Sequence, residues 1–288
     1  SIPDRLKSVD TFVFDCDGVI WRGDHLIPGA KEAIARLRAR NKNVYFVTNN
    51  STKSREGTTA KFTRLGIPVS ANEVLTSSFA AASYLKTIDF PSRRRNKAYV
   101  IGGIGIYEEL SLLGLECVGG PAHANISIDF NEHMEVDPDI GAVVVGLDIS
   151  LNYYKLQYAQ LLLNKNPECL FIATNRDRAF PNKTQLWPGA GSIVASVVGC
   201  TGREPIVVGK PSSVLIDYLV NEHNCTASTM CMVGDRLDTD ILFGRNHDMM
   251  TCLTMSGVTT ESILKSPTNE IYPDVTVNSI ADLPDLLV

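Results

Sequence analysis

Two aspartates separated by one residue stand near the start of the chain, directly after a short apolar run. Phe12, Val13 and Phe14 have the pattern of a buried strand, and Asp15 and Asp17 follow it. Two neighbouring carboxylates repel each other, so the arrangement is unfavourable unless a cation or a shared proton compensates the charge. The pair is therefore a candidate for binding a metal ion or for moving protons.

Groups that could supply this compensation follow three later apolar runs. They are the hydroxyl and main-chain donors of Thr48, Asn49 and Asn50, the cation Lys210, and the carboxylates Asp235 and Asp240. Carboxylate oxygens favour Mg²⁺ over softer metals. Together with a lysine and N–H groups at a helix start, they could bind a phosphoryl group and neutralise its oxygens. Each motif alone is common in turns and helix caps; their joint occurrence favours phosphoryl-transfer chemistry.

Short apolar runs alternate with helical patterns along most of the chain and would position these residues. The predicted strands are Thr11–Asp15, Val44–Thr48, Ala98–Ile101, Ala142–Gly146, Leu170–Thr174, Ile206–Val208, Met230–Val233 and Met250–Thr254. Because the runs are continuously apolar, both faces are expected to be covered, as in the parallel sheets of α/β proteins. Ligands of such sheets bind outside the carboxyl ends of the strands, which is where the candidate residues lie.

Helices and one small hairpin are predicted between the strands. The helices carry Ala30 to Leu37 at helical spacing, run from Ser54 toward Leu65 with Gly66 as the C′ residue, and open at Pro211. The segment DGVIWRGDHLIPGA is expected to form a flap with a tight turn at Gly23 and Asp24. Trp21 within it is interpreted as a core residue, with a place at the substrate entry as the alternative.

The middle of the chain has its own alternation of strands and helices, and its strand ends are less polar. The linker-like segments DFPSRRRNK and GCTGREP precede and follow it. We therefore expect a discontinuous core domain at 1–92 and 205–288, with a second α/β unit inserted at 93–204.

Composition restricts the classes of partner. The chain has 288 residues, a net charge of −5 and seven scattered cysteines. No positive field favours nucleic acid, no apolar stretch is long enough for a membrane helix, and nothing resembles a signal peptide. The cysteines are typical of small buried side chains in a reducing compartment, so a cytoplasmic location is expected.

The order of the motifs is similar to that of a known superfamily. FDCDGVIWRG, FVTNNSTKSR, GKP and MVGDRLDTDI resemble the motifs of the haloacid dehalogenase-like phosphatases, and most of all subfamily IIA, the branch of 4-nitrophenylphosphatase, phosphoglycolate phosphatase and pyridoxal phosphatase. The resemblance implies an α/β fold with a Rossmann-like core, a parallel sheet and a large inserted α/β cap that offers surface for a homodimer.

The resemblance also implies roles for single residues. Asp15 would be the nucleophile that forms an aspartyl-phosphate, and Asp17 would donate and then accept a proton. Mg²⁺ would be held by Asp15, the main-chain carbonyl of Asp17 and Asp235, with Asp240 supporting these ligands. Thr48, Asn49, Asn50 and Lys210 would bind the phosphoryl oxygens.

Selectivity is expected to come from the cap, because the core recognises only the phosphoryl group. The candidates are Asn175, Arg176 and Asp177, with Arg178 following, since the resembled branch has a similar T-N-x-D loop near its active site. An arginine here could pair with a substrate carboxylate, which would suit phosphoglycolate. The segment GGIGIYEEL lacks the third glycine of a dinucleotide fingerprint and is interpreted as a strand-to-helix turn.

The predicted activity is thus Mg²⁺-dependent hydrolysis of a small phosphate monoester, with 4-nitrophenyl phosphate as an in vitro substrate and a phosphoglycolate-type metabolite favoured. Pyridoxal phosphate or a phosphoprotein is the alternative substrate. Two non-enzymatic alternatives are a phospho-aspartate signalling module and a silent binding protein. Receiver domains of the first kind are much shorter and lack an aspartate two residues after the acceptor.

Overall fold

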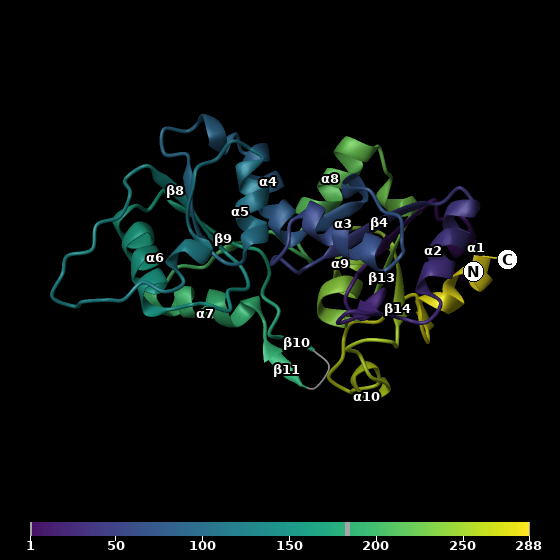
Figure 1. The fold of residues 1–288 in the computed structure, drawn as a ribbon. Coiled ribbons are helices and arrows are strands. Elements are labelled where there is room, and N and C mark those ends of the chain that lie inside the picture. Colours follow the sequence, from purple (N-terminus) through teal and green to yellow (C-terminus); the bar gives the residue numbers. More distant parts are fainter. Residues whose placement is uncertain (1, 182–184, 288) are drawn as a thin grey trace.

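A computed structural model describes residues 2–181 and 185–287 and contains two parallel sheets, each with its own helices (Figure 1). The first sheet has six strands in the order β15-β14-β13-β1-β4-β5. Their bounds are β1 Thr11–Phe14, β4 Asn43–Thr48, β5 Val74–Thr76, β13 Met230–Gly234, β14 Met250–Thr254 and β15 Val275–Val277. All neighbouring pairs are parallel, so their carboxyl ends share one edge.

The second sheet has five parallel strands in the order β12-β9-β8-β6-β7. They are β6 Lys97–Ile101, β7 Cys117–Gly119, β8 Ile140–Val145, β9 Leu170–Ala173 and β12 Ile206–Val207. The α/β fold with a core sheet and a separate cap sheet, expected from the sequence, is confirmed. The domain division at 93–204 stays a proposal; β12 pairs within the second sheet although it follows residue 204.

Helices and short hairpins complete the architecture. The α-helices are α1 Ile2–Lys7, α2 Ala30–Ala39, α3 Arg55–Arg64, α4 Ser77–Thr87, α5 Ile104–Ser111, α6 Tyr153–Lys165, α7 Ala190–Thr201, α8 Val214–His223, α9 Leu242–Asn246 and α10 Glu261–Leu264. The short helical turns are η1 Ala71–Glu73, η2 Phe90–Ser92, η3 Gly120–His123, η4 Ala227–Thr229, η5 Leu237–Ile241 and η6 Ile280–Leu287. The antiparallel hairpins are β2 Trp21–Arg22 with β3 His25–Leu26, and β10 Ala179–Pro181 with β11 Leu186–Pro188. Among the described residues, none of these helices is long and apolar enough to cross a membrane.

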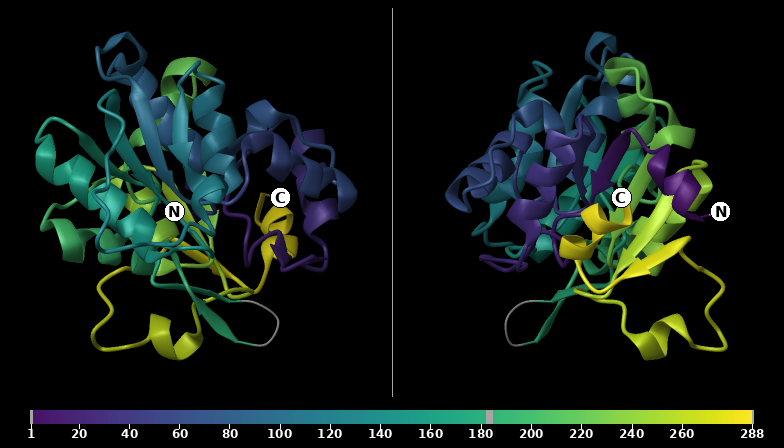
Figure 2. Two further views of the ribbon diagram at one scale, coloured as in Figure 1. Left: turned by 60° about the vertical axis from the view of Figure 1, so that its left-hand side comes forward. Right: turned by 90° about the vertical axis from the view of Figure 1, so that its right-hand side faces the viewer.

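The central strand β1 shows why continuous apolar runs form this sheet. Phe12 and Phe14 pack in one buried cluster with α2, while Val13 faces the opposite cluster with α8, so both faces are covered (Figure 2). Burying one such side chain contributes about 1.5–3 kcal/mol. A polar residue can therefore follow β1 only at its end, where the strand leaves the two cores.

The eight predicted strands all exist, with ends within two residues of those expected. The prediction that a helix opens at Pro211 was wrong in its start: the helix begins at Val214, and Pro211 lies in the turn before it. The helix from Ser54 is confirmed, with Ser54 as N-cap and Gly66 at φ 77° after Leu65. The flap is confirmed as the β2–β3 hairpin, and GGIGIYEEL forms the turn into α5.

Candidate active site

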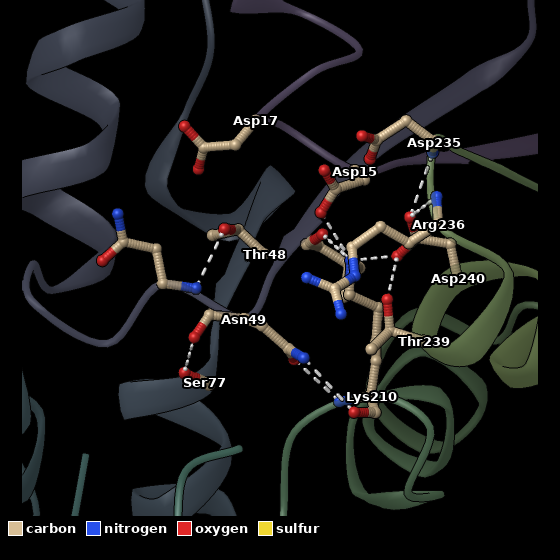
Figure 3. A network of polar contacts seen from close by, with 12 residues as sticks. Asp15, Asp17, Thr48, Asn49, Ser77, Lys210, Asp235, Arg236, Thr239 and Asp240 are labelled. Carbon is tan, nitrogen blue, oxygen red and sulfur yellow. Dashed lines mark hydrogen bonds and ion pairs between the residues drawn. The ribbon is translucent and has the colours of Figure 1, made fainter. Parts of the chain in front are cut away.

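The carboxyl ends of β1, β4 and β13 meet at a cavity of about 340 Å³. Figure 3 shows the polar residues gathered there. Its lining includes predicted residues from both units: Asp15, Asp17, Thr48, Asn49, Asn50, Asn175, Asp177, Lys210 and Asp240. Asp235 lies beside Asp15 and Asp240 in an acidic cluster at the same place. The parallel sheet thus brings together residues separated by almost the whole chain.

Lys210 is the buried cation between the carboxylates. Its ammonium Nζ lies 2.6 Å from Asp15 Oδ1 and 2.8 Å from Asp240 Oδ1, and it donates to the Val47 carbonyl at 2.9 Å. Burial alone would lower the pKa of Lys210, but Asp15 and Asp240 raise it above the ordinary value. Lys210 therefore keeps its positive charge at neutral pH and attracts anionic oxygens.

The acidic cluster carries more negative charge than this lysine compensates. Ligand oxygens of Asp15, Asp235 and Asp240 lie within 4.8 Å of one another, and all three residues are buried. Burial raises the pKa of Asp15 although Lys210 opposes it, and burial with the Asp240 charge raises the pKa of Asp235 to about 7. A further cation here would favour the ionised carboxylates.

Hydrogen bonds show which carboxylate oxygens are free to take that cation. Both Asp240 oxygens are engaged, Oδ1 by Lys210 and Oδ2 by the N–H groups of Asp235 and Arg236 at 3.1 Å each. Asp235 Oδ2 accepts from the Val258 N–H at 2.6 Å, whereas the buried Oδ1 has no hydrogen-bond partner among the described residues. Asp15 and Asp235 therefore fit as divalent-cation ligands, and Asp240 fits as their support.

Glycines make room for this carboxylate. A Cβ on Gly18 would lie 2.5 Å from Asp235 Oδ2, and one on Gly257 would lie 1.8 Å from the same atom. Gly18 also has φ 93°, a conformation that favours glycine. The D-x-D-G sequence thus places its glycine where a side chain would displace the Asp235 carboxylate.

The loop after β4 supplies hydrogen-bond donors and is itself held firmly. Thr48 Oγ1 accepts from the Asn50 N–H at 3.1 Å, which leaves its own hydroxyl proton for a ligand oxygen. Asn49 Oδ1 accepts from the Lys210 N–H at 2.9 Å, and the Asn49 carbonyl accepts from Ser77 Oγ at 2.6 Å. Figure 3 shows this network joining the loop to Lys210.

The cap candidates divide into two groups. Asn175 donates to the Asn49 carbonyl at 2.6 Å, and Asp177 Oδ1 accepts from Asn49 Nδ2 at 3.1 Å, so both contact the loop between β4 and α3. Burial raises the pKa of Asp177. Arg176 instead forms an exposed ion pair with Glu204, and neither Arg176 nor Arg178 is part of the cavity lining.

Several lining or supporting residues were not predicted. Ser77 starts α4 directly after β5, and Arg236 Nη1 donates to the Ala179 carbonyl across the two units at 3.3 Å. Ile149 and Phe180 add apolar surface to the cavity. The run VLTSS at 74–78 was a usable signal for Ser77, because it is another apolar run with a polar end. Ile149 and Phe180 had no signal, since their place depends on how the two units pack.

Comparison with known proteins identifies the superfamily. A model described as haloacid dehalogenase-like hydrolase matches residues 12–116, and a second, HAD-hydrolase-like model matches residues 207–283. Phosphoglycolate phosphatase 1A, chloroplastic, of Arabidopsis thaliana is 52% identical over 280 residues, covering 96% of this chain and 77% of that protein. The chain belongs to the haloacid dehalogenase-like hydrolases.

Further similar proteins are also phosphatases by name, and the solved structures among them have the same fold. Glycerol-3-phosphate phosphatase of Gallus gallus is 38% identical over 96% of this chain and 92% of that protein. The structure of 4-nitrophenylphosphatase from Thermotoga maritima has a TM-score of 0.83 at 28% identity and covers 99% of both chains. Glycerol phosphate phosphatase from Mycobacterium tuberculosis, solved in complex with magnesium, has a TM-score of 0.79 at 25% identity and covers 96% and 78%. The predicted subfamily IIA branch and phosphatase class are confirmed.

Proposed function

We propose that the protein hydrolyses a small phosphate monoester of the phosphoglycolate type, with Mg²⁺ as cofactor and Asp15 as nucleophile. The observation that carries this proposal is the position of Asp15: its Oδ1 lies 2.6 Å from Lys210 Nζ, at the edge of a cavity lined by Asp17 and Thr48. A phosphoryl group at this point would contact the nucleophile, the cation and the hydroxyl donor together.

In the first step, a carboxylate oxygen of Asp15 attacks phosphorus and the bond from phosphorus to the ester oxygen breaks. Asp17 gives its proton to the leaving oxygen, which departs as an alcohol, and Asp15 becomes an aspartyl-phosphate. Lys210 and Thr48 hold the phosphoryl oxygens, so the charge that develops on them is stabilised by groups already in place.

In the second step, a water molecule attacks the phosphorus of the aspartyl-phosphate. Asp17, now ionised, takes a proton from this water, and the bond between phosphorus and the Asp15 oxygen breaks. The products are inorganic phosphate and free Asp15. The protonated Asp17 is then ready for the next ester.

Mg²⁺ is the divalent cation that we propose for the acidic cluster. Its ligands would be Asp15, Asp235 with its free Oδ1, and the predicted main-chain carbonyl of Asp17, with Asp240 held by the Asp235 and Arg236 N–H groups. When bound, it would neutralise phosphoryl oxygens and the carboxylates around them. Two observations support this choice. The available ligands are oxygens, which hard cations such as Mg²⁺ prefer, and a similar phosphatase was solved with magnesium.

The name of the plant relative supports phosphoglycolate as the substrate, and that of the avian relative offers glycerol 3-phosphate as a second candidate. Both are small phosphate esters of an aliphatic alcohol. Asn175 and Asp177 line the cavity and are proposed to contact the alcohol portion. For Arg176, which pairs with Glu204, binding of the substrate carboxylate stays a prediction without geometric support.

Steady-state assays with phosphoglycolate, glycerol 3-phosphate, pyridoxal phosphate and 4-nitrophenyl phosphate test this function. We expect Mg²⁺-dependent phosphate release and the highest kcat/KM for phosphoglycolate. Preference for another ester would overturn the substrate proposal but leave the class intact. Failure to hydrolyse any of the four would overturn the function itself and favour the signalling or binding alternatives.

Partners, cellular location and oligomeric state are predicted from the sequence alone. Absence of a nucleic-acid partner, a cytoplasmic location and a homodimer formed through the cap stay predictions from the sequence. The name of the plant relative includes the word chloroplastic, which describes that protein. Sedimentation of the purified chain tests the dimer, with a monomer at micromolar concentration as the contradicting result.

A further inference from the structure

The indole of Trp21 contacts the proposed acid–base residue. Trp21 Nε1 donates a hydrogen bond to Asp17 Oδ1 at 2.9 Å. Asp17 is exposed and lines the cavity, whereas Trp21 is only 2% exposed and belongs to the β2–β3 hairpin. One end of an otherwise buried aromatic side chain thus reaches a carboxylate that would touch the substrate.

The Trp21 ring has a fixed place in the core. It packs edge-on against Phe62 of α3, with ring centroids 4.7 Å apart. Lys61 Nζ lies 4.1 Å from the ring centroid on another side and donates to the Gly23 carbonyl at 2.8 Å. A cation over an indole draws electron density from the ring, which strengthens the ring N–H as a donor.

The backbone of the flap fixes the two partners relative to each other. The Gly18 N–H donates to the Trp21 carbonyl at 2.7 Å, and the Trp21 N–H donates to the Cys16 carbonyl at 3.2 Å. Asp17 and Trp21 also form an isolated β-bridge. The loop that begins at the nucleophile therefore closes on itself through the tryptophan.

We propose that Trp21 is a positioning residue for proton transfer. Its N–H occupies Asp17 Oδ1 and fixes the carboxyl group, so that Oδ2 faces the cavity and exchanges the proton with the ester oxygen and then with water. Without the indole N–H, an exposed aspartate side chain would sample several rotamers, and only some of them would reach the leaving oxygen. Trp21 itself need not contact the substrate.

This inference rests on the proposed role of Asp17, and Trp21→Phe is the variant that tests it. Phenylalanine keeps an aromatic ring against Phe62 and beneath Lys61 but removes the N–H. We expect kcat/KM for phosphoglycolate to fall about tenfold, the size of one hydrogen bond to a carboxylate. For 4-nitrophenyl phosphate we expect a change below about twofold, because 4-nitrophenolate leaves without taking a proton.

Controls separate positioning from a general effect on structure. Trp187, the other tryptophan of the chain, lies on β11 outside the cavity lining, so Trp187→Phe should leave kcat/KM for both esters unchanged. Thermal unfolding and circular dichroism establish that each variant is folded. An equal loss for both esters in folded Trp21→Phe would overturn the inference, because a distorted site lowers both rates.

A double-mutant cycle with Asp17→Asn completes the test. In the Asp17→Asn background, Trp21→Phe should cause no further loss with phosphoglycolate, since it acts through the carboxyl group that is already altered. A full additional tenfold loss would overturn the inference. If Asp17→Asn alone leaves phosphoglycolate turnover unchanged, the proposed role of Asp17 fails, and the inference fails with it. If Asp17→Asn is impaired and Trp21→Phe is not, the inference fails alone.

Discussion

The same residue type has different surroundings at neighbouring positions of this site. Asp15 is 7% exposed and paired with Lys210, whereas Asp17 is exposed and held by an indole N–H. A buried carboxylate beside a permanent cation suits attack on phosphorus, and an exposed carboxyl group with one free oxygen suits proton exchange. The division of roles that we propose for Asp15 and Asp17 therefore follows from their different environments.

The pKa of Asp235 links the stability of the protein to pH and to metal binding. Burial and Asp240 raise the pKa of Asp235 from 3.8 to about 7 in the metal-free protein. Ionisation is thus disfavoured in the folded state, so stability should fall as pH rises from about 4 to 7. Mg²⁺ would bind the ionised carboxylate, so below pH 7 it would have to displace a proton, which weakens its binding.

Thermal unfolding with and without Mg²⁺ at pH 6 and pH 8 tests whether Mg²⁺ binding strengthens as the pH rises. The rise in Tm caused by Mg²⁺ should be larger at pH 8, because the stabilisation by a ligand of the folded state increases with the logarithm of its affinity. Asp235→Asn should abolish most of the rise at both values. A larger Mg²⁺ effect at pH 6 than at pH 8 would contradict the assignment of the cation to this cluster.

At the scale of elements, the site is formed where strands end and helices begin. The β4 strand ends at Thr48, and α3 begins at Arg55 after the N-cap Ser54, so the loop between them is held at both ends. Ser54 is buried, and its Oγ accepts from the Gly57 N–H at 3.2 Å. This cap defines where the loop ends.

Ser54→Ala should destabilise the protein by about 1 kcal/mol, the usual effect of losing an N-cap hydrogen bond. Urea unfolding measures the change. Ser111→Ala provides the control, because Ser111 is exposed at the end of α5, and its effect should lie within about 0.5 kcal/mol. An equal effect of the two substitutions would contradict the capping role.

The sequence could predict the elements that carry the chemistry because those strands are almost continuously apolar. β1, β4 and β13 have buried side chains almost throughout, and each is followed by a polar motif. β5 and β7 are only three residues long and were not predicted, although both complete a sheet and the run VLTSS that contains β5 carries a similar signal. The contact between Trp21 and Asp17 was not predicted, because a buried tryptophan and a hydrogen-bonded one look alike in sequence.

In the whole molecule, a partly buried ion pair connects the two units next to the loop between β4 and α3. Glu109 of α5 is 1% exposed, and its Oε1 accepts from the N–H of Arg55 at 2.6 Å. The Arg55 guanidinium pairs with Glu109 Oε2 at 3.2 Å and lies over Phe79. How the units pack depends on such contacts between distant segments, so the cavity could not be predicted from sequence.

Glu109→Gln should loosen this contact, since it removes the charge but keeps the side-chain size. We expect a loss of about 1–3 kcal/mol in unfolding free energy and a raised KM for 4-nitrophenyl phosphate. Glu108→Gln on the same helix is exposed and should change neither quantity. Unchanged stability and KM in Glu109→Gln would show that the ion pair does not hold the units together.

We propose that Asp15 carries the phosphoryl group during turnover, and trapping that intermediate is the most direct test of this role. Acid quenching of the enzyme during hydrolysis of ³²P-labelled phosphoglycolate, followed by peptide mapping, should place the label on Asp15 as an acyl phosphate. Asp15→Asn should carry no label and lose at least about a thousandfold in kcat, with its Tm retained. Label on another residue, or full activity in Asp15→Asn, would contradict the account.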